Sequence, residues 1–222
     1  MNQSPTEIRL ALEVGTKKSF ASALDWPGWS RSGKDPPDAI DALLSHRECY
    51  NEVILFAGID PITDKQLTTT VIDRVAGDST TDFGAPGRLV DADWEPINPD
   101  ELARQSSLLR ACWTKFDGVA AVVSPEMTKG PRGGGRDRDA IVDHTLEAER
   151  TYGRRIGVRT PRMAIDDVNA IECHRAAILQ ALTELALTPE FPAKGWSPRY
   201  AIRRIAWHVL DHAWEMQNKD LS

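Results

Sequence analysis

The sequence predicts an α+β protein, in which a small strand-containing unit (residues 1–95) precedes a bundle of four helices (residues 96–222). Apolar residues alternate with polar ones in residues 7–14, which is the two-residue period of a half-buried strand. From residue 98 onward, four segments carry apolar residues at helical spacing instead. The run DWEPINP accumulates prolines between the two patterns, so we expect the boundary near residues 92–99.

The N-terminal unit is predicted to add a second strand, a helix and at least one further strand. The second strand covers residues 19–24 and ends at the turn sequence DWPG. The helix covers residues 38–57, because Asp35 can cap its free amides and prolines tolerate the first turn. Residues 68–75 are rich in β-branched residues, which favours another strand. The glycine-containing connection at residues 77–87 is either an ordered lid or a plain surface connection.

The C-terminal part is predicted to form four helices, each with a stripe of apolar residues that faces the core of the bundle. They are predicted to span residues 98–119, 140–155, 168–187 and 199–218. Asn98 is placed to cap the first helix, and the acidic residues after it suit the positive end of the helix dipole. Two aspartates cap the third helix in the same way.

The composition excludes several classes of protein. The chain has 222 residues, 41% of them hydrophobic, and a formal net charge of −6, which argues against binding to nucleic acid. No stretch resembles a signal peptide or approaches the roughly 18 apolar residues of a membrane span. The cysteines, Cys49, Cys112 and Cys173, are widely spaced and are expected to be reduced, buried and apolar in role. We therefore expect a cytoplasmic protein that contacts neither nucleic acid nor membrane.

Histidines supply the strongest functional signal. His208 and His212 are four residues apart, so on a helix they share one face and can share one metal ion. His144 lies on the inward stripe of a second predicted helix, and three imidazoles from two facing helices would make an open site for zinc, nickel, iron or manganese. An i,i+4 pair alone is more often structural, and histidines satisfied by hydrogen bonds in the core are the alternative. His46 and His174 fit the site less well.

These residues resemble a known family. The segments GWSPRYAIRRIAWHVLDHAWE and DHTLEAE look like the DinB superfamily of metal-binding four-helix bundles, and the resemblance covers about residues 98–219. That family places one histidine on its second helix and an HxxxH pair on a later helix, which implies His144, His208 and His212 as ligands. Several members are thiol transferases or isomerases that use a low-molecular-weight thiol. The resemblance thus implies a divalent metal and a metal-dependent enzyme acting on a small-molecule substrate.

A second resemblance covers about forty residues near the N-terminus. Two strands carrying ALDWPGWSRSG, followed by a helix that opens PPDAIDALLSH, are similar to HicB-like domains. This implies a module that engages a protein partner, although no ribbon-helix-helix or helix-turn-helix segment is evident. The alternative function is therefore a non-enzymatic binding or scaffold protein whose metal is structural. A homodimer through the bundle helices is left open.

Acidic residues near His144 are candidates for catalysis. Glu147 follows it by three residues and could orient a metal-bound water, act as a base or join the ligands. Asp143 and Glu149 are expected to point elsewhere, as solvated helix residues.

A basic loop at residues 129–139 precedes the same helix. Its arginines, Arg132, Arg136 and Arg138, could receive a carboxylate or phosphate of the substrate beside the metal. The alternative is a solvated turn whose charge is countered by two aspartates. Arginines at the start of the last helix could approach this loop, but ion pairs with acids are the commoner arrangement; they are Arg199, Arg203 and Arg204.

Overall fold

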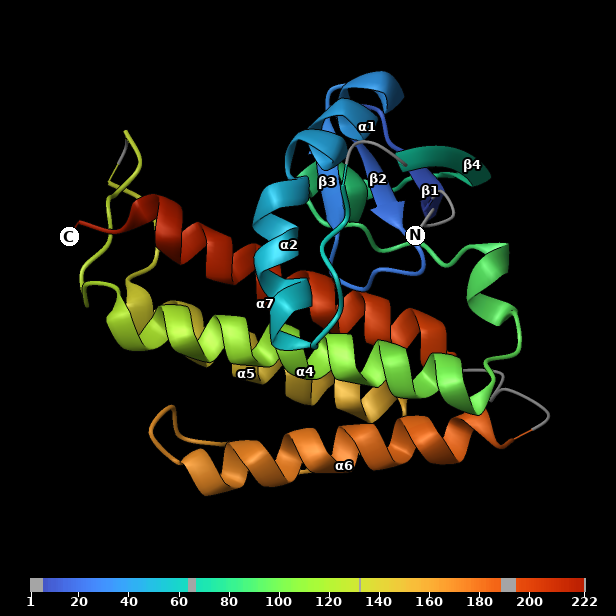
Figure 1. Cartoon of the computed structure of the whole chain (residues 1–222). Helices are drawn as coiled ribbons and strands as arrows, with labels where there is room; N and C mark the ends of the chain where they lie inside the picture. The colour runs from blue at the N-terminus through green and yellow to red at the C-terminus, as the bar shows by residue number, and fades with distance from the viewer. Residues whose placement is uncertain (1–5, 64–66, 132, 189–194, 222) are drawn as a thin grey trace.

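A computed structural model describes residues 6–63, 67–131, 133–188 and 195–221, and it has an α+β fold (Figure 1). A four-stranded sheet near the N-terminus is followed by four long helices. The predicted α+β class is therefore confirmed. Among the described helices, none is long and apolar enough to cross a bilayer.

The sheet is mixed, with the strand order β3-β2-β1-β4. Its strands are β1 (Thr6–Val14), β2 (Ser19–Ala23), β3 (Ser30–Gly33) and β4 (Leu67–Ala76). Neighbours are antiparallel except β1 and β4, which run parallel. The three predicted strands are confirmed, whereas β3 was not anticipated. Its four residues include no β-branched or aromatic side chain, so only pairing with β2 defines it as a strand.

The single helix predicted for residues 38–57 is wrong, because the chain forms α1 (Pro36–Ser45) and α2 (Arg47–Phe56) instead. His46 separates them with φ −89° and ψ 5°, outside the helical region. Its ring packs edge-on against Trp214 of the last helix, with centroids 4.3 Å apart. The turn leaves α1 on one face of the sheet and directs α2 toward the bundle (Figure 1).

The chain between β4 and the bundle, which includes the glycine-containing connection at residues 77–87, contains two short helices. They are α3 (Ser79–Phe83), capped by Asp78, and the 3-10 helix η2 (Asp91–Trp94). Buried Glu13 of β1 accepts hydrogen bonds from the backbone amides of Gly87 (3.2 Å) and Arg88 (3.0 Å). The connection is thus ordered and tied to the sheet.

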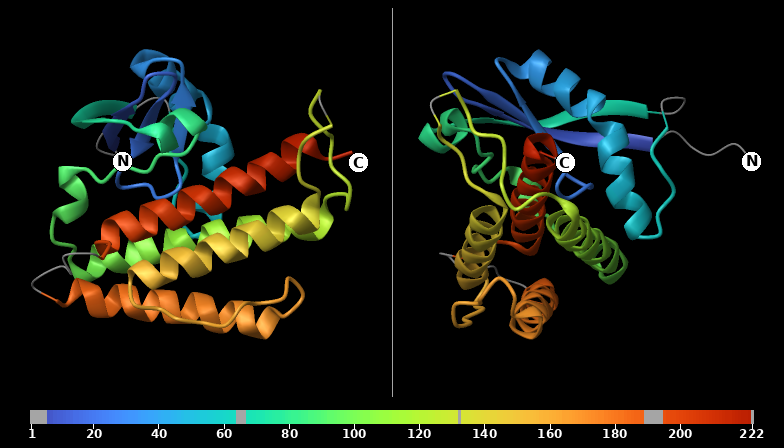
Figure 2. Two further views of the ribbon diagram at one scale, coloured as in Figure 1. Left: turned by 180° about the vertical axis from the view of Figure 1, so that it is seen from behind. Right: turned by 90° about the vertical axis from the view of Figure 1, so that its left-hand side faces the viewer.

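Four helices form the bundle: α4 (Pro99–Val122), α5 (Arg138–Arg155), α6 (Val168–Ala186) and α7 (Pro198–Lys219). The predicted caps are confirmed, since Asn98 accepts from the amide of Glu101 and Asp167 accepts from that of Ala170. α4 and α7 run in one direction and α5 and α6 in the other, and α7 lies between the sheet and the rest of the bundle (Figures 1 and 2).

One hydrophobic cluster includes buried side chains from both parts of the chain, such as Leu10, Tyr50, Leu109 and Ile205. Close approach of the turn after β2 to α7 requires glycine at position 28. Gly28 has φ +92°, and a Cβ atom there would lie 2.6 Å from a methyl carbon of Leu210. The division near residue 95 stays a prediction, while the core is continuous across it.

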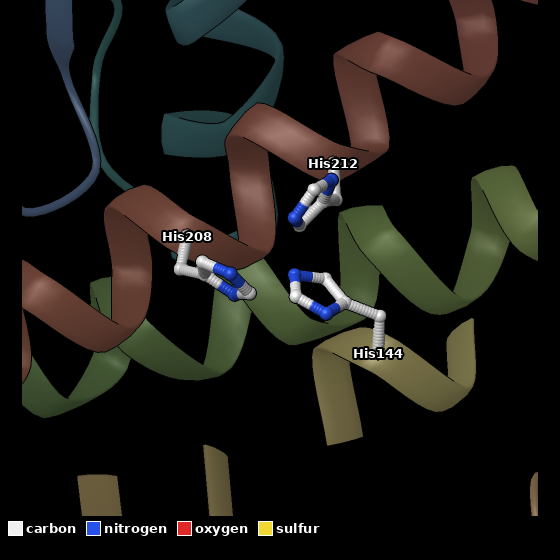
Figure 3. Close-up of side chains that lie close together, drawn as sticks. All are labelled: His144, His208 and His212. Atoms are coloured by element: carbon white, nitrogen blue, oxygen red, sulfur yellow. The ribbon is translucent and has the colours of Figure 1, made fainter. Parts of the chain in front are cut away.

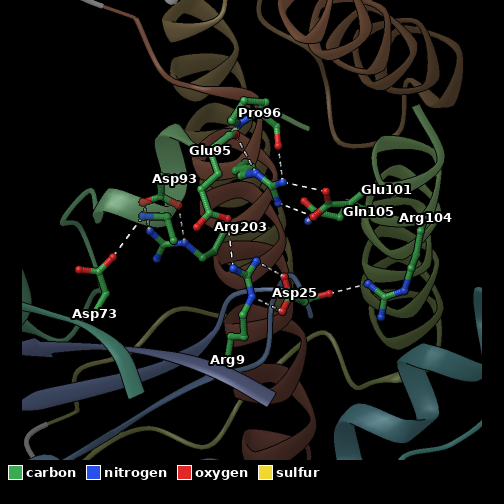
Figure 4. A network of polar contacts seen from close by, with 12 residues as sticks. Arg9, Asp25, Asp73, Asp93, Glu95, Pro96, Glu101, Arg104, Gln105 and Arg203 are labelled. Carbon is green, nitrogen blue, oxygen red and sulfur yellow. Dashed lines mark hydrogen bonds and ion pairs between the residues drawn. The ribbon is translucent and has the colours of Figure 1, made fainter. Parts of the chain in front are cut away.

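Ion pairs and hydrogen bonds hold α7 against the connection that precedes the bundle and against the start of α4 (Figure 4). Arg203 donates to Asp93 at 2.5 Å, and their side chains are only 8% and 2% exposed. Arg199 forms an ion pair with Glu101 and also donates to the Pro96 carbonyl at 2.7 Å. Two of the three arginines at the start of the last helix therefore bind acids, as expected. These contacts set the position of the helix that carries His208 and His212.

The cysteines differ in environment. Cys112 is fully buried in α4, as predicted, and burial raises the pKa of its thiol. Cys49 is half-buried. The prediction is wrong for Cys173, which is exposed because it lies on the outer face of α6.

Candidate metal centre

Two neighbouring antiparallel helices position the candidate centre. α7 begins at Pro198, with Ser197 as its N-terminal cap, and continues without interruption through the histidine pair. His208 and His212 are 7% and 9% exposed on the side of α7 that faces α5. His144 is half-buried on α5. The sequence places these residues together because each lies on the inward stripe of its helix.

The three imidazoles converge between α5 and α7 (Figure 3). One nitrogen of each ring lies within 4.8 Å of the corresponding nitrogens of the other two. The ring centroids of His144 are 5.2 Å from His208 and 5.0 Å from His212, and those of the α7 pair are 4.5 Å apart. The predicted convergence is present.

The surroundings keep two of the imidazoles neutral near pH 7. Burial lowers the pKa of His208 well below its ordinary value, and the positive charge of nearby Arg204 lowers it further. Burial also lowers the pKa of His144, with a contribution from the charge of Arg136. Neutral imidazole has a free lone pair, which is the form that binds a metal.

Glu215 orients the third imidazole. Nδ1 of His212 lies 2.7 Å from Oε2 of Glu215, and this hydrogen bond is the main reason that the pKa of Glu215 falls to about 2. An ionised carboxylate only accepts, so Nδ1 carries the proton and donates it. Nε2 of His212 then holds a lone pair, as in metal sites where a carboxylate orients a histidine ligand. Glu215 was not predicted from the sequence, although it follows His212 by three residues, a spacing at which helix side chains meet.

The donor set fits a divalent metal. Nδ1 of His208 is buried and has no hydrogen-bond partner among the residues that the structure describes. The alternative in which each histidine is satisfied by its own carboxylate does not hold for the described residues, among which His212 alone of the three contacts a carboxylate. Three imidazole nitrogens that approach one another suit zinc, nickel, iron or manganese.

Glu147, the candidate catalytic carboxylate, is directed to arginines. Its side chain forms ion pairs with Arg150 at 3.0 Å and Arg162 at 3.8 Å. Within the described ranges it makes no hydrogen bond or ion pair with the three imidazoles. Its role as a base stays a prediction.

The neighbouring acids behave differently from each other. Asp143 is directed to Arg162, whose guanidinium lies 2.7 Å away, in agreement with a partly solvated helix residue. The same expectation is wrong for Glu149, which is fully buried, accepts a hydrogen bond from Trp113 Nε1 and has a raised pKa because of burial. It faces inward because it lies two helical turns beyond buried Ile141.

The basic loop contributes one arginine to the surroundings of the centre. Arg132 lies outside the described residues, and Arg138 is occupied by Asp139 at 2.8 Å. Arg136 is close enough for its charge to lower the pKa of both His144 and His208.

A second positive charge, from Arg204 of α7, was not expected at the site. Its guanidinium lies over the rings of Tyr152 (5.4 Å) and Trp207 (4.9 Å), whose centroids are 5.6 and 6.0 Å from that of His208. It donates to the Pro86 carbonyl at 2.6 Å. Arg204 thus borders the centre beside an aromatic wall.

The remaining histidines lie elsewhere. His46 packs against Trp214, and burial lowers its pKa to about 4. Nδ1 of His174 lies 2.9 Å from the hydroxyl of Thr160. Neither belongs to the cluster, as the sequence indicated.

Glu215→Gln tests the orienting role of the carboxylate. We expect a loss of about 10- to 100-fold in zinc affinity with little change in folding, because the amide no longer provides an ionised acceptor for Nδ1 of His212. Calorimetric titration with Zn²⁺ measures this affinity, and Glu172→Gln, at an exposed position of α6, is the matched control. Equal affinities in the two variants would remove Glu215 from the centre.

No protein-family model, curated protein or solved structure matches the chain.

Proposed function

We propose that the chain binds a divalent metal through His144, His208 and His212. The observation that carries this proposal is the approach of three imidazole nitrogens within 4.8 Å of one another, from two packed helices. The lowered pKa values of two rings and the carboxylate behind the third support it, since both favour neutral, oriented ligands.

We further propose that the centre is catalytic, in a DinB-like transferase or isomerase that uses a low-molecular-weight thiol. Three protein ligands leave further coordination positions, as in catalytic zinc sites. The half-buried position of His144 supports access from solvent. A bound metal would lower the pKa of a thiol or water that it holds and so supply a nucleophile at neutral pH.

The chain's own residues would bind and orient the substrate. Arg136 and Arg204 are positively charged groups near the imidazoles. They suit an anionic group on a thiol or on the electrophile with which the thiol reacts. Tyr152, which is half-buried, offers aromatic surface beside His208. Glu147 is retained as a candidate base, although in the structure its carboxylate is directed to arginines.

A structural metal is the second candidate. It is favoured by the deep burial of His208 and His212, and by their place on α7, which packs on the other bundle helices and also contacts the sheet through Trp207 and Trp214. In that case the HicB-like part would engage a protein partner and the ion would hold α5 against α7.

Thiol-dependent turnover distinguishes these functions. Protein loaded in turn with zinc, nickel, iron or manganese is incubated with low-molecular-weight thiols and small electrophiles, and loss of free thiol is followed against a protein-free blank. We expect turnover with at least one metal, loss of turnover in His144→Ala, and normal turnover in Cys173→Ser, which removes the exposed cysteine as an alternative nucleophile. Tight metal binding without turnover would favour a structural metal over a catalytic one.

A further inference from the structure

A polar pocket lies apart from the three clustered histidines, where the sheet meets α7. It is bounded by β3, the end of α1 and α7, and has a volume of about 460 Å³. Its polar lining residues are Ser30, Arg31, Ser32, Ser45, His46 and Asp211. None of the three clustered histidines lines it, so the pocket is separate from the candidate metal centre.

Arg31 is the unusual member of this pocket. Its side chain is only 24% exposed, yet it donates no hydrogen bond in the described part of the chain, and its nearest carboxylate, on Asp211, is 3.7 Å away. Other described arginines also form ion pairs and have side chains that are at most 30% exposed. Each of them donates a hydrogen bond to a carboxylate, as Arg203 does to Asp93. Burial accordingly lowers the pKa of Arg31.

The guanidinium is held in place despite lacking hydrogen bonds. It lies over the ring of Trp214, with Cζ 4.9 Å from the ring centroid. Such a contact holds the face of a guanidinium and leaves the N–H groups at its edge available to a ligand. A planar fork of N–H donors at the wall of a polar pocket matches a carboxylate or phosphate, which can accept two parallel hydrogen bonds.

We propose that the pocket between β3, α1 and α7 binds a small molecule through its carboxylate or phosphate group, with Arg31 as the principal contact. The hydroxyls of Ser32 and Ser45 provide further donors at the wall. Phe20 and Ala42 provide apolar surface for the body of the ligand, and the volume is in the range of small-molecule sites.

Asp211 is the group with which such a ligand competes. Its side chain is 41% exposed and makes no hydrogen bond to Arg31, so it can turn toward solvent when an anion binds. Asp211→Asn removes the opposing charge and is expected to strengthen anion binding. This is the opposite direction from the effect of a change at Arg31.

Calorimetric titration of the full chain with inorganic phosphate, phenyl phosphate and benzoate tests the proposal. We expect at least one probe to bind with a dissociation constant below about 1 mM. Arg31→Gln should weaken that binding by at least tenfold, an order-of-magnitude figure for a charge-assisted bidentate contact. Arg74→Gln is the matched control, because it removes the same charge from an exposed site on β4 and should leave affinity unchanged.

The probes also separate the two ligand classes. Preference for phenyl phosphate over benzoate assigns a phosphate ligand, and the reverse assigns a carboxylate. If Arg31→Gln fails to fold, Arg31→Lys keeps the charge without the planar fork and should still weaken binding. Equal affinity in the Arg31 and Arg74 variants, or no binding of any probe to the parent, would overturn the proposal.

Discussion

Replacement of Asp93 by alanine is expected to lower the free energy of unfolding by about 3 to 5 kcal/mol. The substitution leaves the guanidinium of Arg203 without its carboxylate at a position where the side chain is only 8% exposed. A buried charge without a partner is costly because the protein does not replace the water that the charge has lost. Asp93 also accepts from the amide of Val90 at 2.9 Å, so the turn before the bundle loses a contact as well.

Denaturant unfolding measures this loss, with Arg162→Ala as the matched control. Arg162 forms an ion pair with Asp143 at 2.7 Å, but its side chain is 65% exposed, so its removal should cost no more than about 1 kcal/mol. The double variant Asp93→Ala/Arg203→Met should regain part of the loss, since it removes the unpaired charge. A loss in Asp93→Ala as small as that in Arg162→Ala would mean that the pair does not fix α7.

Divalent metal is expected to stabilise the folded chain. Free zinc at about 100 times its dissociation constant should raise the free energy of unfolding by about 2.7 kcal/mol, because the unfolded chain no longer holds the three imidazoles together. His144→Ala should abolish this gain. It is the informative single variant, because His144 is half-buried and its removal disturbs the core less than removal of His208, which is 7% exposed.

Chemical unfolding of parent and variant, with zinc and with a chelator, provides the comparison. The two proteins should have similar stability in the chelator and differ only when zinc is present. An equal zinc-dependent gain in both would place the bound metal elsewhere on the chain.

The features that could be predicted from sequence are local ones. The alternation in β1 and the caps at Asn98 and Asp167 act within a few residues, so pattern alone identified those elements. The histidine cluster was predictable for a related reason. Helical spacing puts His208 and His212 on one face, and a two-helix contact then needs only His144 on the facing stripe.

The features that were missed depend on contacts distant in sequence. α1 and α2 separate at His46. Its ring packs on Trp214, which lies 168 positions later in the chain. β3 exists because β2 pairs with it. Glu149 was expected in solvent, but α5 turns it toward Trp113 of α4. Propensity and spacing carry no information about such partners, because tertiary packing decides them.

α7 links the two candidate sites. Its histidines face α5, whereas Trp207 packs edge-on against Phe20 of the sheet at 6.2 Å and Trp214 supports Arg31 in the anion pocket. Asp211 lines that pocket and directly precedes the proposed ligand His212. The sheet and its connection therefore position the helix on which both proposals depend.

The metal-to-protein ratio of the chain purified without an affinity tag, measured by mass spectrometry, shows whether the three histidines bind a metal. We expect a ratio near one for the parent and near zero for His144→Ala, His208→Ala and His212→Ala. The control His174→Gln, which replaces the histidine beside Thr160, should keep its metal. A parent without metal after incubation with zinc, nickel, iron and manganese, or variants that retain the full ratio, would contradict a three-histidine metal centre.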